Sequence, residues 1–291
     1  MVNAWGEDGH KIVGKIAQNI LNPEIAKRVA SLFQDPFFDG KLPLAALWAD
    51  MIKQIPESPY ANWSFPLHYM TTHDNPGRVC SVDEANDCAG GACIVGAIAN
   101  YTDQLDCENG RDINTRDIAL RFLSHFFGDI TQPLHVCGRA RGGNDIKVTF
   151  DGRPTNLHAI WDRDIVKKRL KDYNDNFETY ANHLTNEITN GAFAKVSQNW
   201  ISCKETQLKG LSLNLRKRAK ATTKCPLTWA IDTNGINCPL VWAAIDDNPK
   251  VDLGGRYYQD AVQVIDQQLA KGGLRLGTFL NIILNKPCEN N

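Results

Sequence analysis

The sequence predicts an all-α protein, built as a single compact and mainly helical domain with one minor β-hairpin and loops held by disulfides. Three observations carry this prediction. Apolar side chains recur with the 3.6-residue period of a helix over most of the 291 residues. A single short segment alternates like a β-strand. Many of the nine cysteines lie in polar stretches between the expected helices.

The first expected helix covers residues 10–33, where Ile12, Val13 and Ile16 begin a helical pattern that is interrupted at Asn22-Pro23. The next expected helices cover residues 43–54, 92–105, 114–128, 157–170 and 173–190. The last two cover 256–271 and 274–285. We expect a break between them at Gly272-Gly273, because glycine is unfavourable inside a helix.

The expected strand is 146–150, which alternates and then runs into the turn pair Asp151-Gly152. Residues 72–93 and 203–240 are rich in Cys, Asn, Asp, Gly and Pro, and we expect both to be disulfide-pinned loops. No repeat and no linker divides the chain. Residues 5–291 are therefore expected to form one domain.

The cysteines indicate a secreted protein or one in the lumen of the secretory pathway, because nine are many for a cytosolic enzyme of this length. None forms a C-x-x-C pair, and the odd count leaves at least one thiol without an internal partner. Sequons at Asn62 and Asn100 fit that route. Val2 and Ala4 fit a signal-peptidase cut before Trp5, so residues 1–4 are interpreted as a leader remnant. No apolar run reaches the roughly 18 residues of a transmembrane helix.

The charge balance argues against one way of binding nucleic acid. The chain has 32 basic and 33 acidic residues, for a formal net charge of −1. A protein that holds a polyanion on a broad basic face needs an excess of positive charge. If the substrate is a polyanion, bound metal is the natural source of that charge.

Two histidine–aspartate pairs suggest such a metal site. His125 and Asp129 lie four residues apart on one expected helix, and His158 and Asp162 repeat the spacing. His135 follows six residues after Asp129. Imidazole and carboxylate are the ligands that zinc takes at catalytic sites. A single pair of this kind is usually a surface hydrogen bond. Here, however, both pairs sit among apolar neighbours, where burial is costly unless a cation compensates.

The chain resembles the zinc-dependent type I nucleases, the fungal single-strand-specific and plant bifunctional nucleases. The resemblance rests on F-L-S-H-F-F-G-D-I-T-Q-P-L-H at 122–135, G-G-N-D-I-K-V-T-F at 142–150 and T-N-L-H-A-I-W-D at 155–162. It extends from W-G-E-D-G-H at 5–10, through L-W-A-D at 47–50 and L-H-Y at 67–69, to L-A-K-G-G-L-R-L at 269–276. It implies a helical fold of the phospholipase C/type I nuclease kind.

The resemblance implies three zinc ions. The first would be held by Asp50, His68, His125 and Asp129, and the second by His135, His158 and Asp162. The third would be held by the free amine and carbonyl of Trp5 with His10, and Asp129 would bridge it to the first. Every one of these positions carries the matching residue type. The remaining histidines, His73 and His183, are expected on the solvated surface.

The resemblance also implies the reaction, which is hydrolysis of single-stranded DNA and RNA to 5′-phosphorylated products, with 3′-nucleotides as further substrates. The metals would activate a water that Asp50 orients toward phosphorus, and Lys53 and Asn144 would contact the phosphate. Tyr69 stands where the family places an aromatic that stacks on a base. Thr71 and Arg141 depart from the fungal pattern at the base pocket, so base preference is not carried over. Neither a stable protein partner nor a membrane is implied.

For the disulfides, the resemblance implies Cys80–Cys225 and Cys88–Cys93. The other five cysteines are left without assigned partners; they are Cys107, Cys137, Cys203, Cys238 and Cys288.

Two other functions compete with the nuclease. A zinc phospholipase C shares the fold and the N-terminal tryptophan, but typically has Glu where this chain has Asp162 and lacks this set of cysteines. A catalytically silent, metal-binding secreted protein is the alternative from a different class. Assays on single-stranded DNA, RNA and phosphatidylcholine would discriminate among the three.

Overall fold

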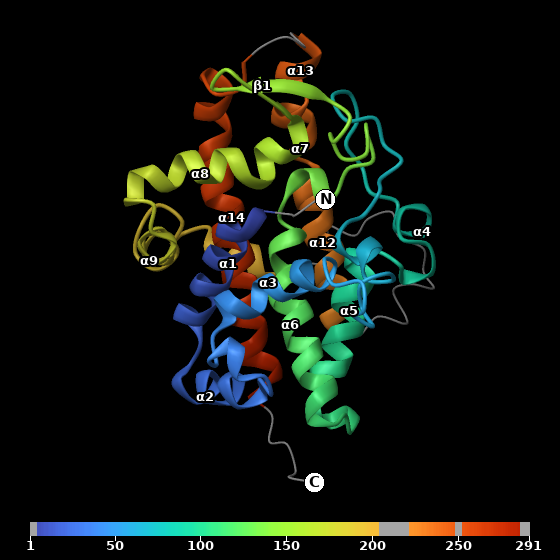
Figure 1. Ribbon diagram of the computed structural model, residues 1–291, viewed down its shortest axis with the longest axis vertical. Coiled ribbons are helices and arrows are strands. Elements are labelled where there is room, and N and C mark those ends of the chain that lie inside the picture. The colour runs from blue at the N-terminus through green and yellow to red at the C-terminus, as the bar shows by residue number, and fades with distance from the viewer. Residues whose placement is uncertain (1–4, 204–220, 248–251, 286–291) are drawn as a thin grey trace.

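The computed structural model describes residues 5–203, 221–247 and 252–285. It is an assembly of packed helices with one small hairpin at an end (Figure 1). Three long helices form its centre: α1 (Gly6–Ile20), α6 (Ile113–Asp129) and α14 (Arg256–Ile283). Helix α1 packs on α14 and on α3 (Leu42–Ile52), while α3 and α5 (Ile94–Leu105) both pack on α6. This agrees with the all-α prediction.

The other elements surround this centre. The helices are α2 (Pro23–Leu32), α4 (Glu84–Asp87), α7 (Leu157–Ala159), α8 (Ile165–Leu170), α9 (Phe177–Thr189), α10 (Ser197–Ile201), α12 (Ala221–Asn234) and α13 (Ala243–Asp247). Short 3₁₀ or π segments are η1 (Pro36–Phe38), η2 (Phe65–His68), η3 (Ala89–Gly91), η4 (Cys107–Asn109), η5 (Pro133–His135), η6 (Ile160–Asp164), η7 (Lys171–Tyr173) and η9 (Asn237–Val241). No helix in the described ranges is both long and apolar enough to cross a membrane.

The expected strand is β1 (Lys147–Phe150), which pairs antiparallel with β2 (Arg153–Asn156). The pair Phe150↔Arg153 closes the hairpin around Asp151 and Gly152, whose φ angles are 49° and 73°. Two consecutive left-handed residues make the turn that matches the twist of a two-residue hairpin, and Asp-Gly is a favoured sequence for it. The predicted hairpin is confirmed.

The core consists of two hydrophobic clusters. One lies among α3, α5, α6 and α12, and the other joins the hairpin, α8 and α9 to the first half of α14. Helix α14 contributes to both, with Ile265 and Leu269 in the second cluster and Leu276 and Leu280 in the first. One continuous helix therefore ties the two halves of the core together.

The predicted break at Gly272-Gly273 is wrong, because α14 runs through both glycines. A Cβ on Gly273 would lie 2.4 Å from Cβ of Ile16, and one on Gly272 would lie 3.0 Å from the Phe127 carbonyl oxygen. The glycines are present because α14 approaches α1 and α6 too closely for a side chain. Tertiary packing of the whole helix outweighs their weak helix propensity.

The prediction that 203–240 is a loop is also wrong in its described part. Helix α12 and η9 occupy much of 221–241, and residues 204–220 lie outside the described residues. Helix α12 has apolar side chains buried against α5, including Leu227 and Trp229, although Pro226 and the nearby polar residues disguise its pattern. Residues 72–93 are mostly loop as expected, with only the short α4 and η3 inside them.

The disulfide predictions are half right. Cys88–Cys93 is confirmed, but Cys80 pairs with Cys238, and Cys225 pairs with Cys203. Cys107 is also disulfide-bonded, Cys137 is a buried free thiol, and Cys288 lies outside the described residues. The error has a structural reason. Cys225 lies early in α12, whereas the chain reaches the loop of Cys80 only after α12, at η9.

Breaking Cys80–Cys238 should destabilise the protein more than breaking Cys88–Cys93. The first bond spans 158 residues and the second spans 5, so chain entropy assigns them about 5 and about 2 kcal/mol. The free energy of unfolding of the two paired Cys→Ser double variants, measured in urea with metal present, checks the order. Peptide mapping that finds Cys80 linked to Cys225 would instead support the pairing that the family resemblance implies.

Candidate metal centre

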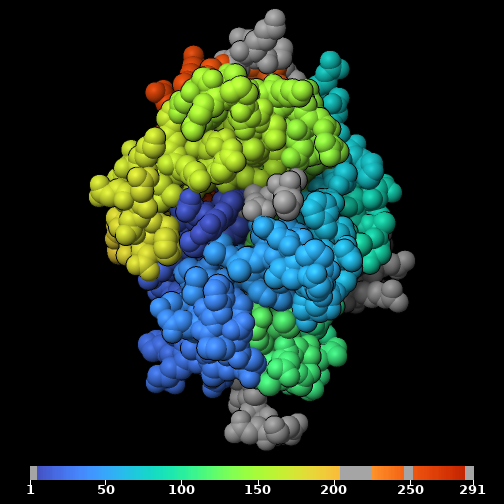
Figure 2. Space-filling model, viewed as in Figure 1, coloured from blue at the N-terminus to red at the C-terminus, as the bar shows by residue number. Residues whose placement is uncertain are grey.

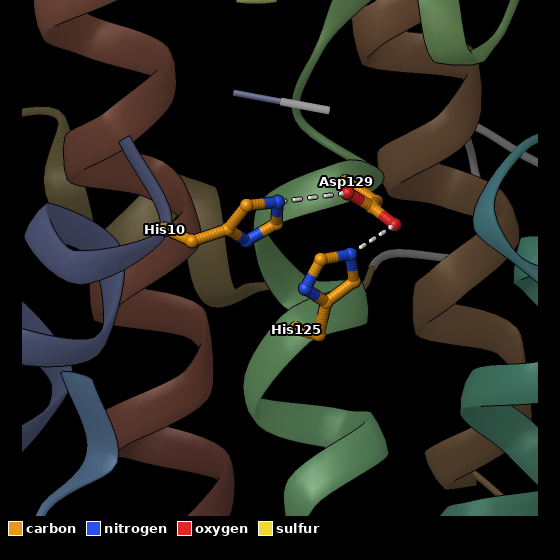
Figure 3. Close-up of side chains that lie close together, drawn as sticks. All are labelled: His10, His125 and Asp129. Atoms are coloured by element: carbon orange, nitrogen blue, oxygen red, sulfur yellow. Dashed lines mark ion pairs between the residues drawn. The ribbon is translucent and has the colours of Figure 1, made fainter. Parts of the chain in front are cut away.

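The candidate ligands come from several elements that meet beside the last turns of α6. Helix α6 starts at the N-cap Asp112, whose carboxylate accepts the backbone N–H groups of Asn114 and Thr115, and it carries His125 and Asp129 on one face. His10 comes from α1, Asp50 from the last turn of α3, and His68 from the end of η2. Figure 3 shows His10 approaching from α1 and His125 from α6, each toward a different oxygen of Asp129.

One carboxylate faces three imidazoles in this group. Asp129 lies 3.2 Å from Nε2 of His10, 3.1 Å from Nε2 of His125 and 2.9 Å from Nδ1 of His68. The His10 and His125 rings are stacked with centroids 3.8 Å apart (Figure 3). Both aspartate oxygens are used, with Oδ1 toward His10 and Oδ2 toward the other two. Asp129 therefore stands between two potential ion positions.

Asp50 completes the first of these positions. Its Oδ1 lies 3.6 Å from Nε2 of His125 and 3.8 Å from Nδ1 of His68. Lys53, one turn further along the chain, forms an ion pair with the same oxygen, and its side chain is only 10% exposed. Lys53 is therefore not a solvated surface residue.

A second group consists of His135, His158 and Asp162, all of them buried. Nε2 of His158 lies 3.0 Å from the Asp162 carboxylate. The other Asp162 oxygen accepts a 2.6 Å hydrogen bond from the side-chain amide of Gln132. Gln132 had not been singled out from the sequence, although its place in T-Q-P-L-H, three residues before His135, was a usable signal.

Backbone carbonyls fix the tautomers of three of these histidines. Nδ1 of His125, His135 and His158 lies 2.6–2.7 Å from the carbonyl oxygens of Ala46, His68 and Gly142, respectively. A carbonyl only accepts, so each Nδ1 carries the hydrogen, and Nε2 of the neutral ring is left with a lone pair. In His125 and His158 that lone pair faces a carboxylate oxygen at 3.0–3.1 Å. Two lone pairs brought together in this way need a cation between or beside them.

Unsatisfied buried atoms mark the same places. Polar atoms with neither solvent contact nor a hydrogen-bond partner include both ring nitrogens of His10, Nε2 of His68, His125, His135 and His158, and Oδ1 of Asp129. Leaving a buried polar group unpaired costs roughly 1–3 kcal/mol. So many in one place indicate a missing partner, and the donor set of nitrogen and carboxylate oxygen fits a divalent transition metal.

The pKa values show that most of these groups are ready to bind a cation. Burial lowers the pKa of His10 and His135, and lowers that of His68 to about 4, so these rings are neutral at neutral pH. Burial alone would also lower the pKa of His125 and His158, but the carboxylates beside them outweigh it and the net shift is upward. Positive charge is therefore favoured beside these carboxylates, and a bound metal ion would supply it.

Trp5 is fully buried at the start of α1, as expected of a core aromatic. Its indole Nε1 donates to the Gly128 carbonyl at 2.8 Å and lies 3.1 Å from the Thr131 hydroxyl. Its own carbonyl accepts the Gly9 N–H at 3.1 Å. The side chain therefore anchors the N-terminal end of α1 to the residue directly before Asp129.

Gly128 allows His10 to approach α6 closely, because a Cβ at residue 128 would lie 2.9 Å from Nδ1 of His10. Gly128→Ala should push His10 away from Asp129 and reduce activity by about a hundredfold, the cost of a misplacement of about 1 Å at a reacting centre. Gly235→Ala, where a Cβ meets only ordinary contacts, is the control. Equal activity of the two variants would show that the His10–Asp129 contact does not matter.

Four of the five predicted substrate contacts line one pocket of about 230 Å³ beside the second group, and Lys53 is not among its lining residues. Tyr69, Thr71, Arg141 and Asn144 all face it, together with His135 and His158. Arg141 is 78% exposed and forms an ion pair with Asp145, and Asn144 donates to the Arg141 carbonyl at 2.8 Å. The structure thus brings together residues that lie far apart in the sequence.

Two further residues of this pocket were not singled out from the sequence. Phe65 is 42% exposed and contacts Tyr69 edge to face, with ring centroids 5.8 Å apart. Its position three residues before His68 was the only available signal. Cys137 is buried in the wall, and burial raises the pKa of its thiol to about 12. The remaining histidines, His73 and His183, are exposed as expected, and His73 contacts Asp87.

The family model described as S1/P1 nuclease matches residues 5–285. The chain belongs to the S1/P1 nuclease family. It is 34% identical to Nuclease P1 of Penicillium citrinum over 284 residues, which cover 96% of this chain and 97% of that protein. It is 33% identical to Nuclease S1 of Aspergillus oryzae over 292 residues, covering 97% and 93%. Endonuclease 2 of Arabidopsis thaliana is 34% identical over 293 residues, covering 97% and 91%.

Membership of the S1/P1 nuclease family makes the chain a hydrolytic nuclease. Three groups of buried side chains could hold metal ions. They are His10, His125 and Asp129; Asp50, His68 and His125; and His135, His158 and Asp162. Figure 2 shows one face of the molecule, on which segments far apart in the sequence lie next to one another. The start of α1, in dark blue, lies between the lighter blue segment of α3 and the yellow-green segment of the hairpin and α8.

Proposed function

We propose that the chain is a zinc-dependent endonuclease that hydrolyses single-stranded DNA and RNA to 5′-phosphorylated products, and that also accepts 3′-nucleotides. The observation that carries this proposal is the set of bare imidazole nitrogens facing carboxylate oxygens in a buried site. Nitrogen and oxygen donors in such numbers favour zinc among the common divalent ions. Family membership supplies the substrate class.

We assign three zinc positions to the groups. Asp50, His68, His125 and Asp129 would hold the first, and His135, His158 and Asp162 the second. The amine and carbonyl of Trp5 would hold the third with His10, while Asp129 serves both the first and the third. The close contacts of Asp129 with His10, His68 and His125 support this shared role. When bound, zinc supplies Lewis-acid stabilisation of phosphate charge and lowers the pKa of water.

The residues around the metal groups perform the remaining tasks. Asp50 orients the attacking water, and its ion pair with Lys53 holds its charge in place. Lys53 and Asn144 contact the phosphate. Both side chains are already held in place without substrate. Lys53 is nearly buried in its ion pair with Asp50, and Asn144 donates a hydrogen bond to the Arg141 carbonyl. Positioned charge of this kind stabilises charge that develops during the reaction.

Tyr69 provides an aromatic surface on which an unpaired base can stack, with Thr71 and Arg141 at the rim of the same pocket. Such stacking needs a base that has left a duplex, and this explains a preference for single strands without any sequence code.

We also propose that residues 5–291 form one nuclease domain of a secreted or lumenal protein. The family match over residues 5–285 supports the single domain. The three disulfides of the described segments and the exposed sequon residues Asn62 and Asn100 support the secretory route.

One set of assays tests the function. Single-stranded DNA, duplex DNA, RNA, a 3′-nucleotide and phosphatidylcholine are each incubated with the protein, before and after chelation and with zinc restored. We expect cleavage of the single strands and the 3′-nucleotide that chelation abolishes and zinc restores. Cleavage of phosphatidylcholine alone would favour a phospholipase, and zinc binding without any turnover would favour a silent metal-binding protein.

A further inference from the structure

A cavity of about 350 Å³ lies on the far side of α6 from the metal groups. It is bounded by α5, α6, α12 and the last turns of α14, and most of its lining is apolar, including Ile98, Phe127, Phe279 and Ile282. Phe127 lies two residues from both His125 and Asp129, so it points from the opposite face of α6. The cavity is therefore separate from the nuclease site. Its size is within the range of small-ligand sites.

The wall of this apolar cavity contains a buried guanidinium, that of Arg275, which is 3% exposed. Its Nε donates to the Trp200 carbonyl at 3.0 Å, and Nη2 donates to Asp232 at 3.1 Å. Nη1 has no partner among the described residues, and neither does Nε1 of the adjacent Trp229. Two kinds of buried N–H donor, both on residues that line one cavity, thus lack an acceptor.

The charges around Arg275 are unbalanced. Asp232 accepts from both Lys271, at 2.8 Å, and Arg275, so one carboxylate faces two cations. Lys271 is 6% exposed. Burial lowers the pKa of Arg275 only to about 10, so the guanidinium is charged at neutral pH. Among the described residues that pair with these two cations, Asp232 is the single carboxylate, and this excess of positive charge beside the apolar space is a costly arrangement unless an anion occupies it.

The acids on the opposite rim do not provide that anion. Asp103 accepts from the Asn109 amide at 3.0 Å and lies 3.8 Å from Arg111. Asp106 accepts the Glu108 N–H at the start of η4. Both carboxylates thus already have partners of their own at the far end of the cavity.

We propose that this cavity is a binding site for an amphiphilic monocarboxylate, with the carboxylate at Arg275 and Trp229 and an aliphatic chain along Phe127, Phe279 and Ile282. A single negative charge matches the single uncompensated positive charge. A carboxylate only accepts hydrogen bonds, and it can therefore satisfy N–H donors that lack a partner. The apolar remainder of the lining offers nothing to the polar edges of a nucleotide and suits a hydrocarbon chain.

The test uses the full, zinc-loaded chain and three probes below their aggregation limits: decanoate, decan-1-ol and acetate. We expect decanoate to bind one-to-one by calorimetry and at least about tenfold more tightly than decan-1-ol, because a hydrogen bond to a charged group contributes about 1.5–3 kcal/mol. Acetate, which can reach zinc but has no chain, should bind far more weakly. Equal affinity for the acid and the alcohol, or no decanoate binding, would overturn the proposal.

Two variants locate the site. Ala99→Phe fills the cavity from α5 while leaving Arg275 in place, and it should abolish binding of decanoate while leaving nuclease activity unchanged. Arg275→Gln should weaken decanoate at least about tenfold and leave decan-1-ol unchanged. Undiminished decanoate binding by Ala99→Phe would place the carboxylate elsewhere and reject the site. The wild-type comparison of acid and alcohol holds even if Arg275→Gln does not fold.

Discussion

Asp129→Asn should remove two of the three proposed zinc ions together and lower turnover by more than about a hundredfold. The side chain keeps its size but loses its charge, and both of its oxygens face imidazoles, one toward His10 and the other toward His68 and His125. Loss of a residue that merely supports a metal ligand already costs 10–100-fold, so a shared ligand should cost more. Elemental analysis of zinc per chain, together with cleavage of single-stranded DNA, measures both effects.

The matched control is Asp117→Asn on the same helix. Asp117 is also buried and charged, but it forms an ion pair with Arg121 and accepts the Gln34 N–H, remote from the metal groups. This variant should lose stability and keep its full zinc content. Loss of a single ion from Asp129→Asn would show that the carboxylate does not bridge. Loss of all three would show that the group of His135, His158 and Asp162 depends on the others.

The sequence predicted most helices because their stability comes from an apolar face, and that face has a readable period. The expected helix over 114–128 is α6 (Ile113–Asp129), and the interruption at Asn22-Pro23 separates α1 from α2. Pro23 begins α2, where its missing N–H costs nothing. Where the local pattern and the tertiary packing agree, as in these helices, the sequence alone was sufficient to predict the helix.

The failures occur where packing decides against local preference. Gly272 and Gly273 indicate a break locally, but they lie inside α14 because two neighbouring helices occupy the space of their side chains. The pairing of Cys80 depends on where α12 ends in space, and no spacing of cysteines along the chain records it. Long-range contacts of this kind carry no local signal.

The same division holds for the site. The pairs His125–Asp129 and His158–Asp162 could be predicted from spacing, since each lies on one helical segment. His10, Asp50 and His68 have no such local partner and were proposed only from the family resemblance. Their meeting at Asp129 depends on the packing of α1 and α3 against α6. The sequence likewise gave no sign of the uncompensated charge on Arg275, which arises only when α14 packs beside α12.

A protein that begins at Trp5 should hold one more zinc ion than the form that keeps Met1–Ala4. A free α-amine has a pKa of about 7.7–8.0 and gives up its proton to a metal easily. An amide nitrogen cannot coordinate in this way, so the peptide bond to Ala4 should empty the third position and remove most turnover. The indole of Trp5 already anchors this end of α1 at Gly128, next to Asp129.

The two forms are compared by zinc content and by cleavage of single-stranded DNA, and Trp5→Phe in the shorter form is the matched control. That variant keeps the amine but loses the hydrogen bonds of the indole to Gly128 and Thr131, so it separates anchoring from coordination. We expect it to retain the third zinc with lowered affinity, whereas the extended form lacks that ion at any attainable zinc concentration. The second group of His135, His158 and Asp162 should stay filled in all three proteins. Equal zinc content and equal activity of the extended and shorter forms would show that the amine is not a ligand, and would leave a two-metal hydrolase as the better description.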